Sequence, residues 1–82
     1  MKYIIFDQNG LELPVVFPEM IGHDSMKNVF GNCPVVSAGF CRFYYDRDCD
    51  STIAACWGES VSLGVKSREE DIRILANVNE NY

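Results

Sequence analysis

The side chains best suited to nucleophilic or metal chemistry in this 82-residue chain are one histidine, His23, and four cysteines. The thiols lie seven or eight residues apart, at Cys33, Cys41, Cys49 and Cys56. A structural zinc site needs closely spaced Cys or His pairs, and no Cys-x-x-Cys occurs here. The spacing favours reduced thiols that act as small hydrophobic side chains, rather than zinc ligands or disulfides. A Cys/His enzyme or metal-binding protein is the alternative, and it requires the fold to bring His23 to a thiol.

Three acids alternate along a short polar segment, at Asp46, Asp48 and Asp50, as they do at the start of an EF-hand calcium loop. That loop needs Gly at its sixth position and Glu at its twelfth, where this chain has Ser51 and Trp57. The flanking segments are also typical of strands, whereas an EF-hand needs helices. We therefore predict a solvated turn, with weak calcium binding as the alternative.

A second acidic group follows Ser67, at Glu69, Glu70 and Asp71. Consecutive acids point in different directions around a helix, so they cannot form a catalytic carboxylate pair. Ser67 and Glu70 instead have the spacing of a capping box, which predicts a helix start. No Gly-rich phosphate loop is present. The sequence therefore predicts no catalytic residue, no metal ligand and no cofactor.

Aromatic side chains are concentrated between residues 40 and 57. They either build the core beneath a helix or form an exposed face, since Tyr and Trp are typical anchors of protein interfaces. A domain this small needs its rings for stability, so the sequence leaves this choice open. If the face is exposed, acids beside it would steer a basic partner toward it. The residues of this predicted protein-binding face are Phe43, Tyr44, Tyr45, Asp46, Asp48, Asp50 and Trp57.

The N-terminal third predicts a hairpin followed by a short helix. Strands at 2–7 and 11–17 are joined by Asn9-Gly10, the dipeptide best suited to a type I′ turn. Pro14 cannot donate a ladder hydrogen bond, so the second strand is expected at a sheet edge or interrupted there. A short helix capped by Asp24 or Ser25 would run to Phe30. Its expected buried face is Met26, Val29 and Phe30.

The rest of the chain predicts a second hairpin and a C-terminal helix. Strands at 35–45 and 52–57 flank the acidic tip, and a bulge at Gly39 would turn both apolar sets of the first strand inward. The helix would extend to about Asn77 and bury Ile72, Leu75 and Ala76. The fold class predicted is α+β: a small antiparallel sheet of two hairpins, with one short and one C-terminal helix covering one face. We expect a single domain over residues 1–78 and a frayed tail over residues 79–82.

The composition excludes several classes of protein. Twelve Asp and Glu against seven Lys and Arg give a net charge of −5, whereas proteins that bind a phosphate backbone are basic. The acid excess is also too small to require a DNA mimic. No apolar run approaches the ~20 residues of a membrane span, and Asp7 interrupts what would be the apolar core of a signal peptide. We therefore expect a cytoplasmic globular protein that binds neither nucleic acid nor membranes.

The segment Gly58–Arg68 contains the pattern G-E-S-x-S-L-G-x-x-S-R, followed by an acidic helix start. In this pattern the chain resembles small proteins of bacteriophages and prophages, which also open with a strand like Met1–Phe6 and a return like Val15–Pro18. Val36–Phe40 is similar too, but the longer aromatic hairpin with the Asp46–Asp50 tip departs from that group. The group has no established activity, so the resemblance implies no functional residue. It implies a phage protein that binds a host protein, including defence machinery such as CRISPR complexes.

Together these features predict a non-enzymatic phage or prophage protein that acts in the host cytoplasm. Its partner would be a host or phage protein, and one such activity is inhibition of host defence, like that of an anti-CRISPR protein. A small structural phage protein that forms a homodimer through the same face is the first alternative. A Cys/His metal-binding protein that uses His23 is the second.

Overall fold

The computed structural model describes the backbone of residues 1–80 and the side chains of residues 1–78. Four strands form an antiparallel sheet in the order β2-β1-β3-β4. Their bounds are β1 (Lys2–Gln8), β2 (Leu11–Phe17), β3 (Val35–Asp46) and β4 (Ser51–Trp57). With the helices α1 (His23–Val29) and α2 (Asp71–Glu80), and a small second sheet of β5 (Glu59–Ser60) and β6 (Val65–Lys66), this confirms the predicted α+β fold.

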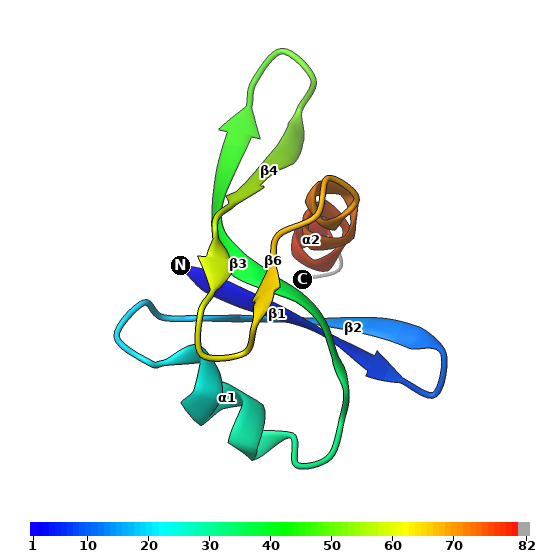
Figure 1. Ribbon diagram of the computed structural model, residues 1–82. Helices are drawn as coiled ribbons and strands as arrows, with labels where there is room; N and C mark the ends of the chain where they lie inside the picture. The colour runs from blue at the N-terminus through cyan, green and yellow to red at the C-terminus, as the bar shows by residue number, and fades with distance from the viewer. Residues whose placement is uncertain (81–82) are drawn as a thin grey trace.

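Strand β1 is buried on both faces, because elements cover the sheet from both sides (Figure 1). Tyr3 and Ile5 pack toward α2, where they meet Leu75. Ile4 and Phe6 point the other way, toward α1 and the β5–β6 segment. The prediction of helical cover on a single face was therefore wrong. A continuous apolar strand directs alternate side chains to its two faces, so both faces of β1 must be covered. The short helix and the β5–β6 segment cover Ile4 and Phe6.

Strand β3 is long enough to join the two hairpins. Its first half pairs with β1 and its second half with β4, so the outer part of the β3–β4 hairpin projects beyond β1 and β2 (Figure 1). The register shift lies opposite Ile5 and Phe6, whose partners are Ser37 and Val35, so Val36 is the extra residue. The bulge predicted at Gly39 was therefore wrong.

Gly39 has a different role, because the backbone approaches it closely. A Cβ at this position would lie 2.5 Å from the Trp57 carbonyl oxygen and 3.3 Å from Ser67 Cβ. The missing side chain lets the start of the β5–β6 segment pass over β3. Side chains beyond Gly39 keep the alternation of a regular strand, and Cys41 faces α2 while Phe40 faces away from it.

Helix α1 is present as predicted, but its cap and its buried face differ from the prediction. Gly22 is the N-cap residue, and no side chain caps this helix. Met26 and Phe30 pack against the core, whereas Val29 is 72% exposed. The apolar triplet that the spacing predicted is therefore split, because α1 contacts the sheet along a narrow stripe.

Helix α2 begins later than the capping box predicted and runs past Asn77 to Glu80. The prediction was a capping box between Ser67 and Glu70. In the structure the corresponding bond lies one residue later: the backbone N–H of Arg68 donates to Asp71 Oδ2 over 3.0 Å. Leu75 is fully buried, and Ile72 is 39% exposed instead of buried. The frayed tail predicted over residues 79–82 was wrong for residues 79 and 80, whose backbone belongs to α2, and residues 81 and 82 lie outside the described part of the chain.

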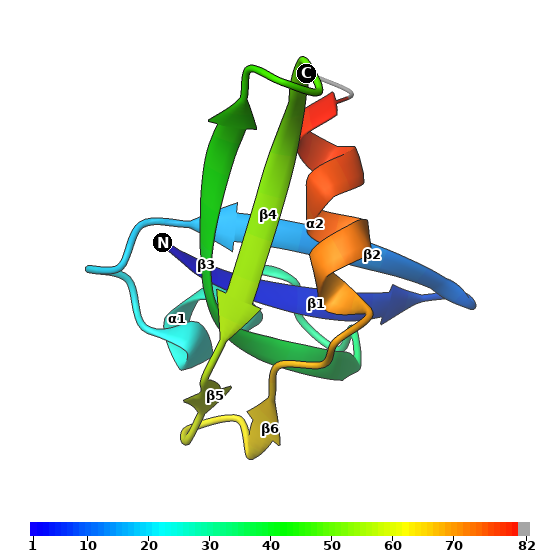
Figure 2. The ribbon, with the colours of Figure 1, turned by 90° about the horizontal axis from the view of Figure 1, so that it is seen from above.

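Figure 2 shows α2 running alongside β4 on one side of the sheet, with α1 on the other. Along most of its length, the β3–β4 hairpin is therefore covered by a helix on one face and not on the other. Within residues 1–80 the structure has no helix that is both long and apolar enough to span a membrane.

Candidate functional site

The face of the β3–β4 hairpin that points away from α2 carries several aromatic side chains. Side chains of neighbouring residues on a strand point to opposite faces, so every second cross-strand pair of the hairpin lies on this face. We call it the outer hairpin face, and it consists of Phe40 with Trp57, Arg42 with Ala55, and Tyr44 with Ile53. The exposed fractions of Tyr44, Ile53 and Trp57 are 45%, 44% and 48%. These are large apolar groups left accessible together.

A chain of ring contacts fixes the base of the outer hairpin face. The rings of Phe40 and Trp57 stack with centroids 6.4 Å apart at an interplanar angle of 21°. His23 packs edge-on against both Phe40 and Phe17, at 5.9 Å and 5.5 Å. Its Nε2 lies 3.0 Å from the Gly39 carbonyl oxygen, which can only accept, so Nε2 carries a proton and donates. His23 is 6% exposed, and this environment accounts for it as a packing residue.

The hairpin tip uses two of its three acids to shape the turn. Asp46 Oδ1 accepts from the backbone N–H of Asp48 over 3.0 Å, and Asp50 adopts a positive φ of 49°. The Tyr45 hydroxyl donates to Asp50, and this hydrogen bond raises the pKa of Tyr45. The acids therefore stabilise a polar, exposed turn, as the sequence predicted.

The structure divides the aromatic residues that the sequence grouped together. Tyr44 and Trp57 lie on the outer hairpin face, and Tyr45 lies at the tip with 63% of its surface exposed. Phe43 packs on the opposite face, within the core beneath α2. The prediction that Phe43 belongs to the binding face was therefore wrong. Phe43 lies two residues after Cys41 in β3, so its side chain points to the same side, toward α2. Alternation along the two strands is the signal that would have separated them.

Sequence reasoning missed three members of the outer hairpin face, Arg42, Ile53 and Ala55, and gave Phe40 no part in it. Strand pairing was needed to find them, because each becomes a member only through its neighbour on the other strand. Arg42 is exposed and lies between the Phe40–Trp57 pair and the Tyr44–Ile53 pair. It gives the apolar face a central positive charge.

The two thiols beneath α2 do not have the properties of reactive cysteines. Cys41 and Cys56 face each other across β3 and β4 on the side of α2. Burial raises the pKa of Cys41 to about 11 and also raises the pKa of Cys56. Cys33 donates a hydrogen bond to a backbone carbonyl, and Cys49 is exposed at the tip. Buried thiols with raised pKa values are protonated at neutral pH and are weak nucleophiles.

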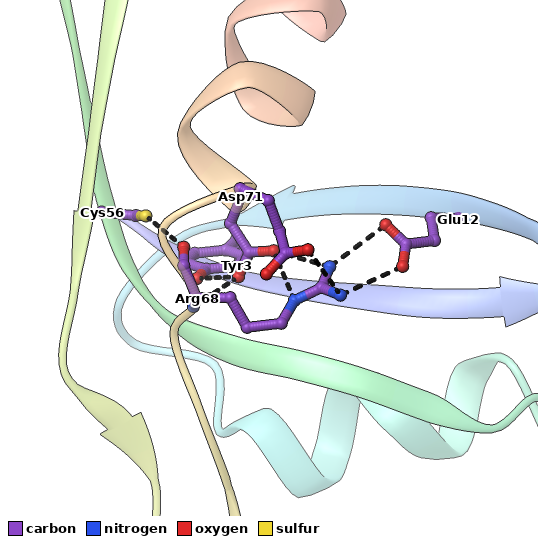
Figure 3. A network of polar contacts seen from close by, with 6 residues as sticks. Tyr3, Glu12, Cys56, Arg68 and Asp71 are labelled. Atoms are coloured by element: carbon purple, nitrogen blue, oxygen red, sulfur yellow. Dashed lines mark hydrogen bonds and ion pairs between the residues drawn. The ribbon is translucent and has the colours of Figure 1, made fainter.

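A buried carboxylate lies where α2 meets β1 (Figure 3). Asp71 is fully buried, and its Oδ2 accepts from the Tyr3 hydroxyl over 2.6 Å and from the Arg68 backbone N–H over 3.0 Å. Its Oδ1 accepts from Arg68 Nε over 3.0 Å and lies 2.8 Å from Nη2. Burial alone would raise the pKa of Asp71, but the hydrogen bonds from Tyr3 and Arg68 outweigh it and lower this pKa. The carboxylate is therefore ionised and fully engaged.

The same network reaches the second strand through Glu12. Both carboxylate oxygens of Glu12 accept from the Arg68 guanidinium over 3.1 Å, in a bidentate pair. The Ser37 hydroxyl is buried and has no hydrogen-bond partner within the described residues. The network joins α2 to β1 and β2, and a substrate could not reach its central carboxylate. We interpret it as a structural connection, which no pattern in the sequence predicted.

A shallow depression of about 500 Å³ lies on the described surface beside β5 and β6. Lys66 and Arg68 line it, and Glu12 and Asp71 already hold the Arg68 guanidinium. A depression of about 390 Å³ lies between β4 and α2, and one of about 320 Å³ between β2 and α2. Within the described residues, no group of three or more His, Cys, Asp or Glu side chains is placed to hold a metal ion.

No protein-family model, curated protein or solved structure matches this chain. The geometry of the outer hairpin face and the chemistry of its side chains are therefore the basis for a functional proposal.

Proposed function

We propose that this chain is a non-enzymatic phage or prophage protein that binds another protein through the outer hairpin face. One observation carries the proposal: Tyr44, Ile53 and Trp57 are each nearly half exposed on one continuous strand surface. Trp, Tyr and Arg are the residues most enriched at the energetic centres of protein interfaces. A small domain usually needs its large rings to stabilise the core. This domain leaves its only tryptophan nearly half exposed, which favours a role for Trp57 in binding.

The rigidity of this surface supports the proposal. The Phe40–Trp57 stack and the ladder between β3 and β4 hold the exposed rings in one arrangement. The opposite side of the hairpin is packed on α2 through Phe43 and Ala54. Side chains that are already ordered lose little conformational entropy on binding, so more of their contact energy appears as affinity.

The charge near this surface favours a partner with a basic patch. Asp46, Asp48 and Asp50 are exposed or half-exposed at the tip, and the whole chain carries a net charge of −5. Such charges raise the association rate with a basic surface and are screened by salt. The partner we propose is a host or phage protein, in keeping with the sequence resemblance, and inhibition of host defence is one consequence such binding would have.

The groups that catalysis would need are committed elsewhere, which also supports a binding role. His23 Nε2 donates to a carbonyl, Cys41 and Cys56 have raised pKa values, and Asp71 is enclosed by donors. A nucleophile requires a base within hydrogen-bond reach, and these side chains are not arranged in that way.

The proposal is tested by affinity capture with three forms of the protein as bait: wild type, Trp57→Ala and Met20→Ala. Met20 is 90% exposed and lies outside the hairpin, so it is a matched apolar control. A stoichiometric partner should bind wild type and Met20→Ala, and Trp57→Ala should weaken binding at least about tenfold once the partner is purified. Equal binding by all three forms would contradict the proposal.

Light scattering of the purified protein separates the homodimer alternative. We expect a monomer whose mass is unaffected by Trp57→Ala. A dimer that Trp57→Ala dissociates would replace the proposed partner with a second copy of the chain.

If the protein captures a partner, reversing Asp46, Asp48 and Asp50 to Lys should slow association and change its salt dependence.

A further inference from the structure

Strand β4 is an edge strand without the usual protection. Its only strand partner is β3, and in the described part of the chain no other backbone hydrogen bond involves it. Its seven residues, Ser51–Trp57, include no charged side chain and no proline. Proteins normally protect an exposed edge with Lys, Pro or a bulge, because its unpaired N–H and C=O groups accept another strand. The opposite edge, β2, contains Glu12 and Pro14.

The depression of about 390 Å³ opens directly beside this edge. Its lining residues come from β4 on one side and from α2 and the residues before it on the other, and α2 runs alongside β4 (Figure 2). Ile72, which is 39% exposed, and the half-buried Ala76 provide apolar surface on the helix side. The lining residues are Thr52, Ile53 and Ala54 from β4, Glu69 and Glu70 before α2, and Ile72, Arg73 and Ala76 from α2.

A strand added to β4 would place alternate side chains in this groove. An added strand lies about 4.8 Å from its neighbour, and its side chains alternate between the two faces of the sheet. Ala54 faces α2, so the residue of the added strand opposite it would point toward the helix as well. Ala54 and Ala76 are small, which leaves space for an apolar side chain of moderate size.

The charge of the groove selects a basic segment. Glu69 and Glu70 are both exposed, and Arg73 is the single cation among the lining residues. The tip adds further acids next to β4, since Asp50 immediately precedes Ser51 and Asp46 is the strand partner of Ser51. A basic side chain on the added strand would therefore meet the carboxylates of Glu69 and Glu70 on the helix side of the groove or the acids of the tip at its end.

We infer that the groove between the edge of β4 and α2 binds an extended segment of the partner as a fifth strand. The segment carries an apolar residue of moderate size directed toward α2, flanked by Lys or Arg. This inference rests on the proposed function and names the kind of segment that the partner contributes. It uses the edge and the α2 side of the hairpin, whereas the outer hairpin face lies on its other side.

The test is a titration of the ¹⁵N-labelled protein with the capped peptide Lys-Val-Lys-Val-Lys-Val-Lys. We expect backbone shift changes confined to β4 and to residues 69–76 of the helix region. Two control peptides separate the causes: one replaces each Lys by Glu, and the other is N-methylated at alternate residues so that one edge cannot donate hydrogen bonds. Each should bind at least about tenfold more weakly than the parent.

Matched protein variants test the charge of the groove. The double variant Glu69→Lys and Glu70→Lys should weaken peptide binding at least about fivefold. The control, Glu19→Lys with Asp24→Lys, changes the net charge equally but lies at exposed positions on the α1 side, so it should bind within about twofold of wild type. Circular dichroism verifies that all variants are folded.

Three results would overturn the inference: no shift changes up to about 2 mM peptide, equal binding of the N-methylated peptide, or a dimer that pairs through β4. The two surfaces are distinguished by the variants. If the peptide fails to bind while Trp57→Ala still abolishes partner binding, the groove is wrong and the proposed function stands. If the peptide binds as expected and Trp57→Ala has no effect on the partner, the outer hairpin face is wrong.

Discussion

The buried carboxylate at the start of α2 leads to the sharpest stability prediction, which concerns Asp71→Asn. Oδ2 of Asp71 accepts from Tyr3 and from the Arg68 backbone, and Oδ1 accepts from the Arg68 guanidinium. An asparagine has one acceptor oxygen and one amide nitrogen that only donates. Either orientation of the amide therefore places its NH₂ against donors and leaves them unsatisfied.

The expected loss is a large part of the total stability. Removing one member of a buried, hydrogen-bonded ion pair costs about 3–5 kcal/mol, and we discount this to about 2–4 kcal/mol because Arg68 keeps Glu12 and is partly exposed. A domain of this length has a free energy of unfolding of about 4–12 kcal/mol. The melting temperature should fall by about 10–25 °C.

Urea unfolding followed by circular dichroism measures this loss, with Glu12→Gln as the control. Glu12 is more than one-third exposed, so losing its charge should cost about 1 kcal/mol or less. If Asp71→Asn were as mild as Glu12→Gln, the carboxylate would not be the centre of the network. Because the folded-state pKa of Asp71 is lowered, its contribution is present above the unfolded pKa of about 3.9 and is lost as the pH falls through the folded value. The difference between wild type and Asp71→Asn should therefore shrink below about pH 4.

Three further predictions follow from the packing and the pKa shifts. Gly39→Ala should destabilise the protein by about 3 kcal/mol in urea unfolding, because its Cβ would lie 2.5 Å from the Trp57 carbonyl oxygen; a near-neutral substitution would disprove this contact. Tyr3→Phe should cost about 1–2 kcal/mol at pH 7, since the buried carboxylate loses a donor. Burial, and then the hydrogen bond to that carboxylate, raises the pKa of Tyr3, so wild type loses stability above about pH 10 and the gap to Tyr3→Phe should narrow there. In native alkylation followed by mass spectrometry, the exposed Cys49 should react first and the buried Cys41 last; the reverse order would contradict their placement.

Local patterns in the sequence predicted the four long strands and the two helices, although not the β5–β6 sheet or the bounds of α2. Asn9-Gly10 joins β1 and β2, and both residues adopt the positive φ values that the turn requires. Pro14 correctly placed β2 at a sheet edge. These predictions succeeded because turn geometry and ladder hydrogen bonds depend on neighbouring residues.

The proposed binding face could be predicted only in part, because its membership depends on which side of β3 is covered by α2. The sequence identified Tyr44 and Trp57 but grouped them with Phe43, which the packing of α2 draws into the core. The buried network was missed entirely. Its members come from three separate parts of the chain, and Tyr3, Glu12 and Asp71 show no pattern until the fold brings them together.

The central claim, that the outer hairpin face binds another protein, is tested most directly at Trp57. It is the single tryptophan of the chain and lies at the base of the outer hairpin face, so incorporation of 5-fluorotryptophan gives one ¹⁹F resonance from the proposed interface. The resonance should shift or broaden in proportion to added partner and saturate at a defined stoichiometry. A resonance that stays unchanged while the partner is bound would contradict the claim.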